Sequence, residues 1–82
     1  MKIIYFANVK ELIGKDSEFI KINKPLKIRE IVEILVKKSE KHRKAFTVIP
    51  NLACSINCSF SDFNQIVNDD DEIAFFPPVT GG

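Results

Sequence analysis

The chain has 82 residues, 45% of them hydrophobic and 28% charged, and its 12 basic and 11 acidic side chains leave a formal net charge of +1. These values exclude a disordered charged tail, a collagen-like repeat and a membrane-spanning helix, and they argue against nucleic acid as a partner, since nucleic-acid binders carry a strong basic excess. A chain this short buries roughly 60% of its unfolded surface, enough for one small core with little room for an enclosed active site, so we expect a single domain that works through its surface.

The first predicted strand covers residues 2–7, where β-branched and aromatic side chains occupy both parities, as in a strand covered on both faces. One or two helical turns are expected over residues 9–13. Gly14 should end them, because glycine adopts a left-handed backbone without steric cost. Residues 17–22 then alternate and predict a second strand that pairs with the first as a hairpin.

One long amphipathic helix is predicted from Ile28 to His42. Apolar side chains recur there at the spacing of one helical face, namely at Ile28, Ile31, Val32 and Leu35. Basic residues crowd its C-terminal end, where they interact favourably with the helix dipole. Its start lacks a capping hydroxyl, because Lys27 stands where serine, threonine, aspartate or asparagine would serve. Residues 45–50 are expected to be irregular.

Three more strands are predicted in the second half of the chain. Residues 52–57 form the third, Phe60 begins a short fourth, and residues 72–76 form the last after an acidic turn at residues 68–71. This order, without repeats or linkers, indicates an α+β roll with one main helix packed on one face of a sheet. A β-grasp arrangement fits best, in which the first and last strands pair in parallel at the centre of a mixed sheet. We expect residues 1–76 to form this domain and residues 77–82 to form a flexible, extended C-terminal tail.

The two cysteines, Cys54 and Cys58, are predicted to be small buried or half-buried thiols. If the segment is extended, their Cα atoms lie roughly 13 Å apart, which is too far for a disulfide. Their spacing also differs from the C-x-x-C pattern of zinc and redox sites, and the single histidine, His42, cannot complete a metal site from the helix. We therefore expect no metal and no bound cofactor. The N-terminus has no signal-peptide pattern, which predicts a cytoplasmic protein.

The C-terminus is the most unusual segment. Two of the three glycines are its last two residues, and no side chain from Ile73 onward carries a charge. In the string FFPPVTGG at residues 75–82, Pro77 and Pro78 lack N–H donors, so they end the last strand and project the chain as extended backbone. Gly81 and Gly82 have no side chains, so the terminal carboxylate could enter a channel only as wide as a peptide backbone.

This pattern indicates that the carboxylate of Gly82 is the reactive group. A carboxylate is a poor electrophile, so its chemistry needs activation, typically by ATP as an acyl-adenylate. The chain lacks the GxxxxGK[ST] motif that cradles phosphate, so ATP must be used by a separate activating enzyme. The alternative is a frayed terminus without function, against which the missing charges, the paired prolines and the paired glycines argue together.

These residues resemble a known family, the sulfur carrier (small, MoaD-type) subunit of molybdopterin synthase, a ubiquitin-like β-grasp protein. The resemblance spans nearly the whole chain and is carried by YFANVKELIG at residues 5–14, ACSIN at residues 53–57 and DEIAFFPPVTGG at residues 71–82. A terminal Gly-Gly alone would be weak support, because ubiquitin-like modifiers and thiamine-pathway sulfur carriers share it.

The resemblance implies that Gly82 is adenylated by an ATP-dependent activating enzyme and then converted to a thiocarboxylate. It further implies that the tail inserts into the large catalytic subunit, where sulfur passes to cyclic pyranopterin monophosphate to build the dithiolene of molybdopterin. The inserted residues would be Pro77, Pro78, Val79, Thr80 and Gly81. In that family two small and two large subunits form a heterotetramer, and the acid–base groups belong to the large subunit. The chain would thus be a sulfur-donor subunit and not an enzyme on its own.

Three phenylalanines are candidate contacts for the large subunit: Phe6, Phe76 and Phe60. Phe6 and Phe76 match family positions, and on adjacent central strands they could share the sheet face that the helix leaves uncovered. The alternative is that both are core residues. The basic run at residues 37–44 could steer an acidic partner, although a solvated helix end also explains it.

Two other functions remain open from the sequence. One is a sulfur carrier for thiamine synthesis or tRNA thiolation, with the same chemistry on Gly82 and a different acceptor; Phe75 through Thr80 argue against it. The other is a ubiquitin-like modifier, whose terminal glycine ends in an isopeptide bond to lysine, or a binding module with an inert tail.

Overall fold

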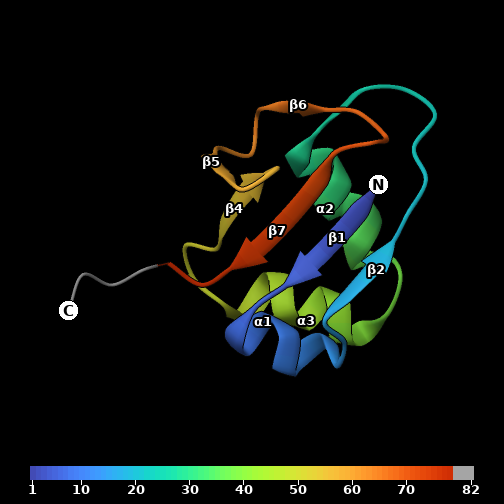
Figure 1. Cartoon of the computed structure of the whole chain (residues 1–82). Helices are drawn as coiled ribbons and strands as arrows, with labels where there is room; N and C mark the ends of the chain where they lie inside the picture. The colour runs from blue at the N-terminus through green and yellow to red at the C-terminus, as the bar shows by residue number, and fades with distance from the viewer. Residues whose placement is uncertain (79–82) are drawn as a thin grey trace.

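The first and last strands of the chain meet at the centre of one mixed sheet. The computed structural model describes residues 1–78. Its five-stranded sheet has the order β2-β1-β7-β4-β5, and a separate two-stranded ribbon joins β3 to β6 (Figure 1). The strands are β1 (Lys2–Tyr5), β2 (Ser17–Phe19), β3 (Leu26–Lys27), β4 (Ala53–Ile56), β5 (Ser59–Ser61), β6 (Ile66–Val67) and β7 (Glu72–Phe76). The helices are α1 (Ala7–Ile13), α2 (Ile28–Val36) and α3 (Glu40–Val48).

The central strands β1 and β7 run parallel, with Lys2 opposite Glu72 and Tyr5 opposite Phe75. The remaining neighbours in this sheet pair antiparallel. The structure therefore confirms the predicted α+β roll of β-grasp type, with the first and last strands side by side at the centre. The bounds of β7 are those predicted from the sequence.

One face of the sheet forms the core. The strand period of two sends Ile3 and Tyr5 of β1 and Ile73 and Phe75 of β7 to this covered face, and each is at most 1% exposed. The helices pack over it with their own buried apolar residues: Val9 of α1, Ile28, Ile31 and Leu35 of α2, and Ala45 of α3. Complete burial of such a side chain is worth about 1.5–3 kcal/mol, so this layer is what holds the sheet and the helices together.

The prediction of one helix from Ile28 to His42 is wrong, because two helices occupy residues 28–48. Helix α2 ends at Val36, and Ser39 then adopts an extended backbone and accepts a hydrogen bond from the His42 N–H at 3.2 Å. Serine at this position is a strong N-cap, so it starts α3 in a new direction. The predicted irregular stretch at residues 45–50 is also wrong, since α3 continues to Val48.

The start of α2 agrees with the prediction that it lacks a capping hydroxyl. The Lys27 side chain does not cap the helix, because an ammonium group has no acceptor. One hydrogen bond of a capping box is present, since the Glu30 carboxylate accepts from the Lys27 backbone N–H at 2.9 Å.

Two boundaries in the first third of the chain differ from the prediction. Strand β1 ends at Tyr5, since Phe6 is the N-cap of α1 and Ala7 is its first residue. Strand β2 covers only Ser17–Phe19, although the antiparallel hairpin with β1 is confirmed. Gly14 ends α1 as predicted, with a left-handed φ of 89° and its N–H donated to the carbonyl of Lys10 at 2.8 Å.

The second half of the chain is close to the prediction. Strand β4 lies within the predicted residues 52–57, and Phe60 lies in the short strand β5. The acidic turn at residues 68–71 is confirmed, with the Asp71 carboxylate accepting from the Asn68 N–H at 2.7 Å. Cys58 contradicts the prediction. It is exposed, because it lies with Asn57 in the tight turn between β4 and β5, where both residues have positive φ.

Candidate functional site

The sheet face opposite the helices is apolar and uncovered. Alternation along the strands places these side chains on it: Ile4, Phe19, Phe60, Ala74 and Phe76. Phe6 continues the extended backbone of β1 by one residue, so its side chain joins them. We call this set the open face. Large exposed apolar groups gathered on one side of a small domain mark a surface that another molecule covers.

The exposed fractions of the candidate phenylalanines show how far each is buried. Phe6 is 50% exposed and Phe60 is 80% exposed, so the alternative that Phe6 is a core residue is wrong. Phe76 is half-buried because the ring of Phe60 packs edge-on against it, with centroids 5.7 Å apart. The structure therefore brings Phe60 and Phe76 together on one side of the sheet, and Phe6 lies on the adjacent central strand.

Backbone contacts hold Phe6 in place at the end of β1. Its N–H donates to the carbonyl of Phe75 at 3.1 Å, and its own carbonyl accepts from the Val9 N–H at 3.1 Å. The next residue, Ala7, has a φ of 52°, a left-handed conformation that costs about 1–2 kcal/mol for a residue with a Cβ. The tight connection between β1 and α1 thus keeps Phe6 extended, with its side chain half in solvent.

Charge is confined to the end of the open face away from the tail. Lys2 and Glu72 are the charged side chains that β1 and β7 place there, and they lie opposite each other in the parallel register. The other end carries Phe6 and Phe76, and β7 finishes at Phe76. The chain therefore leaves the sheet from the uncharged, aromatic end of the open face.

The predicted tail lies mostly beyond the structural description. Pro77 is half-buried and Pro78 is exposed, and both follow the end of β7 as predicted. Val79, Thr80, Gly81 and Gly82 lie outside the described residues.

Among the described residues, no metal cluster, no pocket and no membrane-spanning helix is found. Across residues 1–78, no group of three or more His, Cys, Asp or Glu side chains is placed to hold a metal ion. No pocket is found in the same part of the chain. None of the helices between Met1 and Pro78 is long and apolar enough to cross a membrane.

A charged cluster around Glu18 is the feature that sequence reasoning missed. Glu18 lies opposite Ile3 in the β1–β2 register, on the covered face, and its side chain is only 8% exposed. It contacts His42 of α3, a pairing that the sequence pattern does not predict. A signal was present in the sequence, because Glu18 shares its strand parity with Ile20 and Ile22 and so falls on the apolar side of the predicted strand.

The two thiols have opposite environments. Burial raises the pKa of Cys54 to about 11, with the charge of Asp62 adding to the effect, and its Sγ donates to the carbonyl of Ser61 at 3.4 Å. Cys54 is 1% exposed, so little of it is present as the reactive thiolate. Cys58 is exposed in the β4–β5 turn.

Thiol labelling tests this assignment of the two cysteines. In the folded protein at neutral pH, iodoacetamide should add one group rapidly, at Cys58, and a second only after denaturation, as read by mass spectrometry. The variant Cys58→Ser should remain unlabelled while folded. Rapid labelling of the folded Cys58→Ser variant would show that β4 does not bury Cys54.

Known proteins resemble this chain along its full length. A family model described as the ThiS family matches residues 3–82. The molybdopterin synthase sulfur carrier subunit of Escherichia coli is 32% identical over 82 residues, which cover 100% of this chain and 99% of that protein. The subunit of the same name from Haemophilus influenzae is 37% identical over 83 residues, with 100% and 99% covered.

Solved structures share the fold. Small archaeal modifier protein 1 of H. volcanii superposes with a TM-score of 0.79 at 18% identity, covering 96% of this chain and 97% of that one, so this likeness shows the fold alone. A chain in the complex of subunits 1 and 2 of the molybdopterin-converting factor from Helicobacter pylori superposes with a TM-score of 0.66 at 28% identity, covering 99% and 96%. The predicted ubiquitin-like fold is thereby confirmed.

Proposed function

The chain belongs to the ThiS family of ubiquitin-like proteins, and we propose that it serves as the sulfur carrier subunit of a molybdopterin synthase. The observation that carries the proposal is the match over the whole length to relatives of that name, in a chain whose last strand ends beside an exposed aromatic surface. The described residues supply no acid–base cluster at that end, so the reaction takes place in a site that a partner provides.

The chemistry belongs to the carboxylate of Gly82. In the activating enzyme this carboxylate attacks the α-phosphate of ATP, releases pyrophosphate and becomes an acyl-adenylate. Sulfur at the oxidation level of hydrosulfide then attacks the acyl carbon, and AMP leaves with the displaced carboxyl oxygen. The product is a thiocarboxylate, whose sulfur is a soft nucleophile. The carrier itself binds no cofactor in this scheme, and ATP is bound by the activating enzyme.

The aromatic end of the open face supplies the docking surface for the large subunit. Phe6, Phe60 and Phe76 form the aromatic end of this face, and burying exposed aromatic rings is a strong source of binding energy. With that end docked, Pro77 through Gly81 lead into the large subunit and bring Gly82 to the cyclic pyranopterin monophosphate. Two carriers and two large subunits would assemble as a heterotetramer. The complex of subunits 1 and 2 from Helicobacter pylori supports a partner of this kind.

The other functions differ in what happens to Gly82. A carrier for thiamine synthesis or tRNA thiolation would form the same thiocarboxylate and pass its sulfur to another acceptor. A modifier would form an isopeptide bond with a lysine of another protein. The likeness to small archaeal modifier protein 1 concerns the fold and does not favour this second function.

Reconstitution tests the proposed sulfur transfer. The carrier is prepared in two forms, with a carboxylate or a thiocarboxylate at Gly82, and each is mixed with the large subunit and cyclic pyranopterin monophosphate. The thiocarboxylate form should yield molybdopterin and revert to the carboxylate, which mass spectrometry detects as replacement of sulfur by oxygen. The carboxylate form should bind the large subunit without yielding product.

Two results would contradict the proposal. One is a thiocarboxylate carrier that binds the large subunit and transfers no sulfur to the pterin. The other is recovery of the chain from its own cells as a ladder of lysine conjugates, which would favour the modifier.

Substitution of Phe60 tests the docking surface. Phe60→Ala should weaken binding of the large subunit by about 1–3 kcal/mol, because a large exposed aromatic ring of the proposed docking surface is lost. The melting temperature should change little, since Phe60 is 80% exposed. Isothermal titration calorimetry measures the affinity, and thermal denaturation measures the stability.

Phe19→Ala is the matched control. Phe19 is 74% exposed on the same face, but it pairs with Lys2 at the end away from the tail. Its substitution should leave the affinity nearly unchanged. Equal weakening by both variants, or none by Phe60→Ala, would show that the aromatic end of the open face is not the docking surface.

A further inference from the structure

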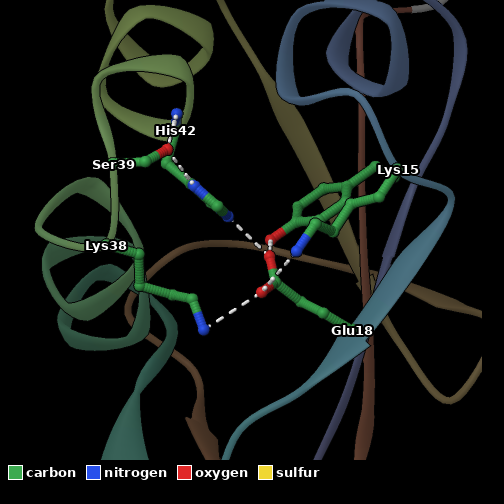
Figure 2. Close-up of polar contacts among 6 residues, drawn as sticks. Lys15, Glu18, Lys38, Ser39 and His42 are labelled. Atoms are coloured by element: carbon green, nitrogen blue, oxygen red, sulfur yellow. Dashed lines mark hydrogen bonds and ion pairs between the residues drawn. The ribbon is translucent and has the colours of Figure 1, made fainter.

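A single carboxylate joins three parts of the fold that are distant in the sequence (Figure 2). Glu18 of β2 accepts a hydrogen bond from the Tyr5 hydroxyl of β1 at 2.6 Å, and its Oε2 lies 2.6 Å from Nε2 of His42 in α3. Its other oxygen lies 3.1 Å from Nζ of Lys38, in the turn between α2 and α3, and 3.6 Å from Nζ of Lys15, before β2. We call these residues, together with Ser39, the Glu18 cluster.

The negative charge of Glu18 would destabilise the fold without its hydrogen-bond and ion-pair partners, because the cluster is buried. The side chains of Glu18 and His42 are 8% and 5% exposed. Desolvation alone would raise the pKa of Glu18, but the hydrogen bonds from Tyr5, His42 and Lys38 outweigh it and lower that pKa to about 2. Burial, followed by the contacts with Glu18, raises the pKa of the Tyr5 hydroxyl, which keeps it protonated as a donor. The carboxylate therefore remains ionised and fully bonded at neutral pH.

Two of the groups around Glu18 are cations. Lys15 and Lys38 flank one oxygen, while the His42 ring bonds the other and contacts Ser39 through its far nitrogen at 2.7 Å. Lys10 of α1 is paired with Asp16, the residue before β2, at 2.7 Å. Removing the charge of Glu18 would thus leave Lys15 and Lys38 without their shared anion.

The two segments that the cluster joins lie at an edge of the sheet and at the end of a helix. Strand β2 has three residues, lies at the edge of the sheet and pairs only with β1. Residues 40–43 form the first turn of α3, which begins at Glu40. Strand edges and helix ends open locally at lower free energy than the sheet centre, where β7 is paired on both sides.

We propose that Glu18 is a latch that fastens the edge strand β2 to the start of α3, so that neutralising its charge opens these two segments together while β7 and β4 remain folded. The carboxylate attracts Lys15 and Lys38 when it is ionised, and these two cations repel each other when it is neutral. This inference concerns the fold and does not depend on the proposed function.

The latch has a defined dependence on pH. The pKa of Glu18 in the folded protein is about 2, below its ordinary value of 4.5, so its stabilising contribution is complete above pH 4.5. The contribution is lost as the pH falls from 4.5 toward 2, when Glu18 takes up a proton. Opening of β2 and α3 should therefore increase over this range.

Amide hydrogen exchange tests the latch directly. At pH 6, Glu18→Gln should speed exchange at residues 17–19 and 40–43 by about tenfold or more, with protection in β4 and β7 unchanged. The wild-type protein should lose protection in the same two segments between pH 4.5 and 2, after correction for the intrinsic exchange rate. In Glu18→Gln this pH response should be absent.

Two further variants complete the design. Tyr5→Phe removes one donor and keeps the ring, so it should speed exchange in the same two segments by a smaller factor. Glu33→Gln removes an exposed carboxylate of α2 that lies outside both segments, so it should leave their exchange unchanged. Faster exchange throughout β4 and β7, unfolding of Glu18→Gln, an unaltered rate in residues 17–19 and 40–43, or an equal effect of Glu33→Gln would each overturn the proposal.

Discussion

The parallel pairing of β1 with β7 is the constraint on which the other features depend. Residues 2–5 lie beside residues 72–75 at the centre of the sheet, so the first and last strands bury Ile3, Tyr5, Ile73 and Phe75 under the same helices. Because side chains alternate along a strand, the next residues, Phe6 and Phe76, are directed to the other face. The same pairing that builds the core therefore places aromatic groups on the surface where β7 ends.

The two faces of the sheet have separate roles. The covered face carries the apolar core and, at its β2 edge, the buried Glu18 cluster, which is charged and fully bonded. The open face carries exposed phenylalanines, which are costly to leave in water unless another molecule covers them. Stability thus depends on one face and the proposed docking on the other.

Sequence patterns correctly predicted the elements whose boundaries depend on residues close together in the chain. Alternation and turn residues predicted β7 and the acidic turn, and Gly14 ended α1 because its left-handed φ suits glycine. The break at Ser39 was missed because the basic residues around it fit a helix C-terminus equally well, and α3 is fixed by tertiary burial of His42 and Ala45. Alternation could place Phe6 and Phe76 on one face, but only the packing of the helices on the other face shows that this face is uncovered.

The proposed function requires that the folded domain and the terminus at Gly82 be separable. Removing residues 79–82 and measuring both the melting temperature and sulfur transfer in the reconstituted synthase tests this requirement. We expect a melting temperature within a few degrees of the full-length chain and no transfer, because the core is complete at Phe76. A large drop in melting temperature, or transfer that survives the truncation, would contradict it.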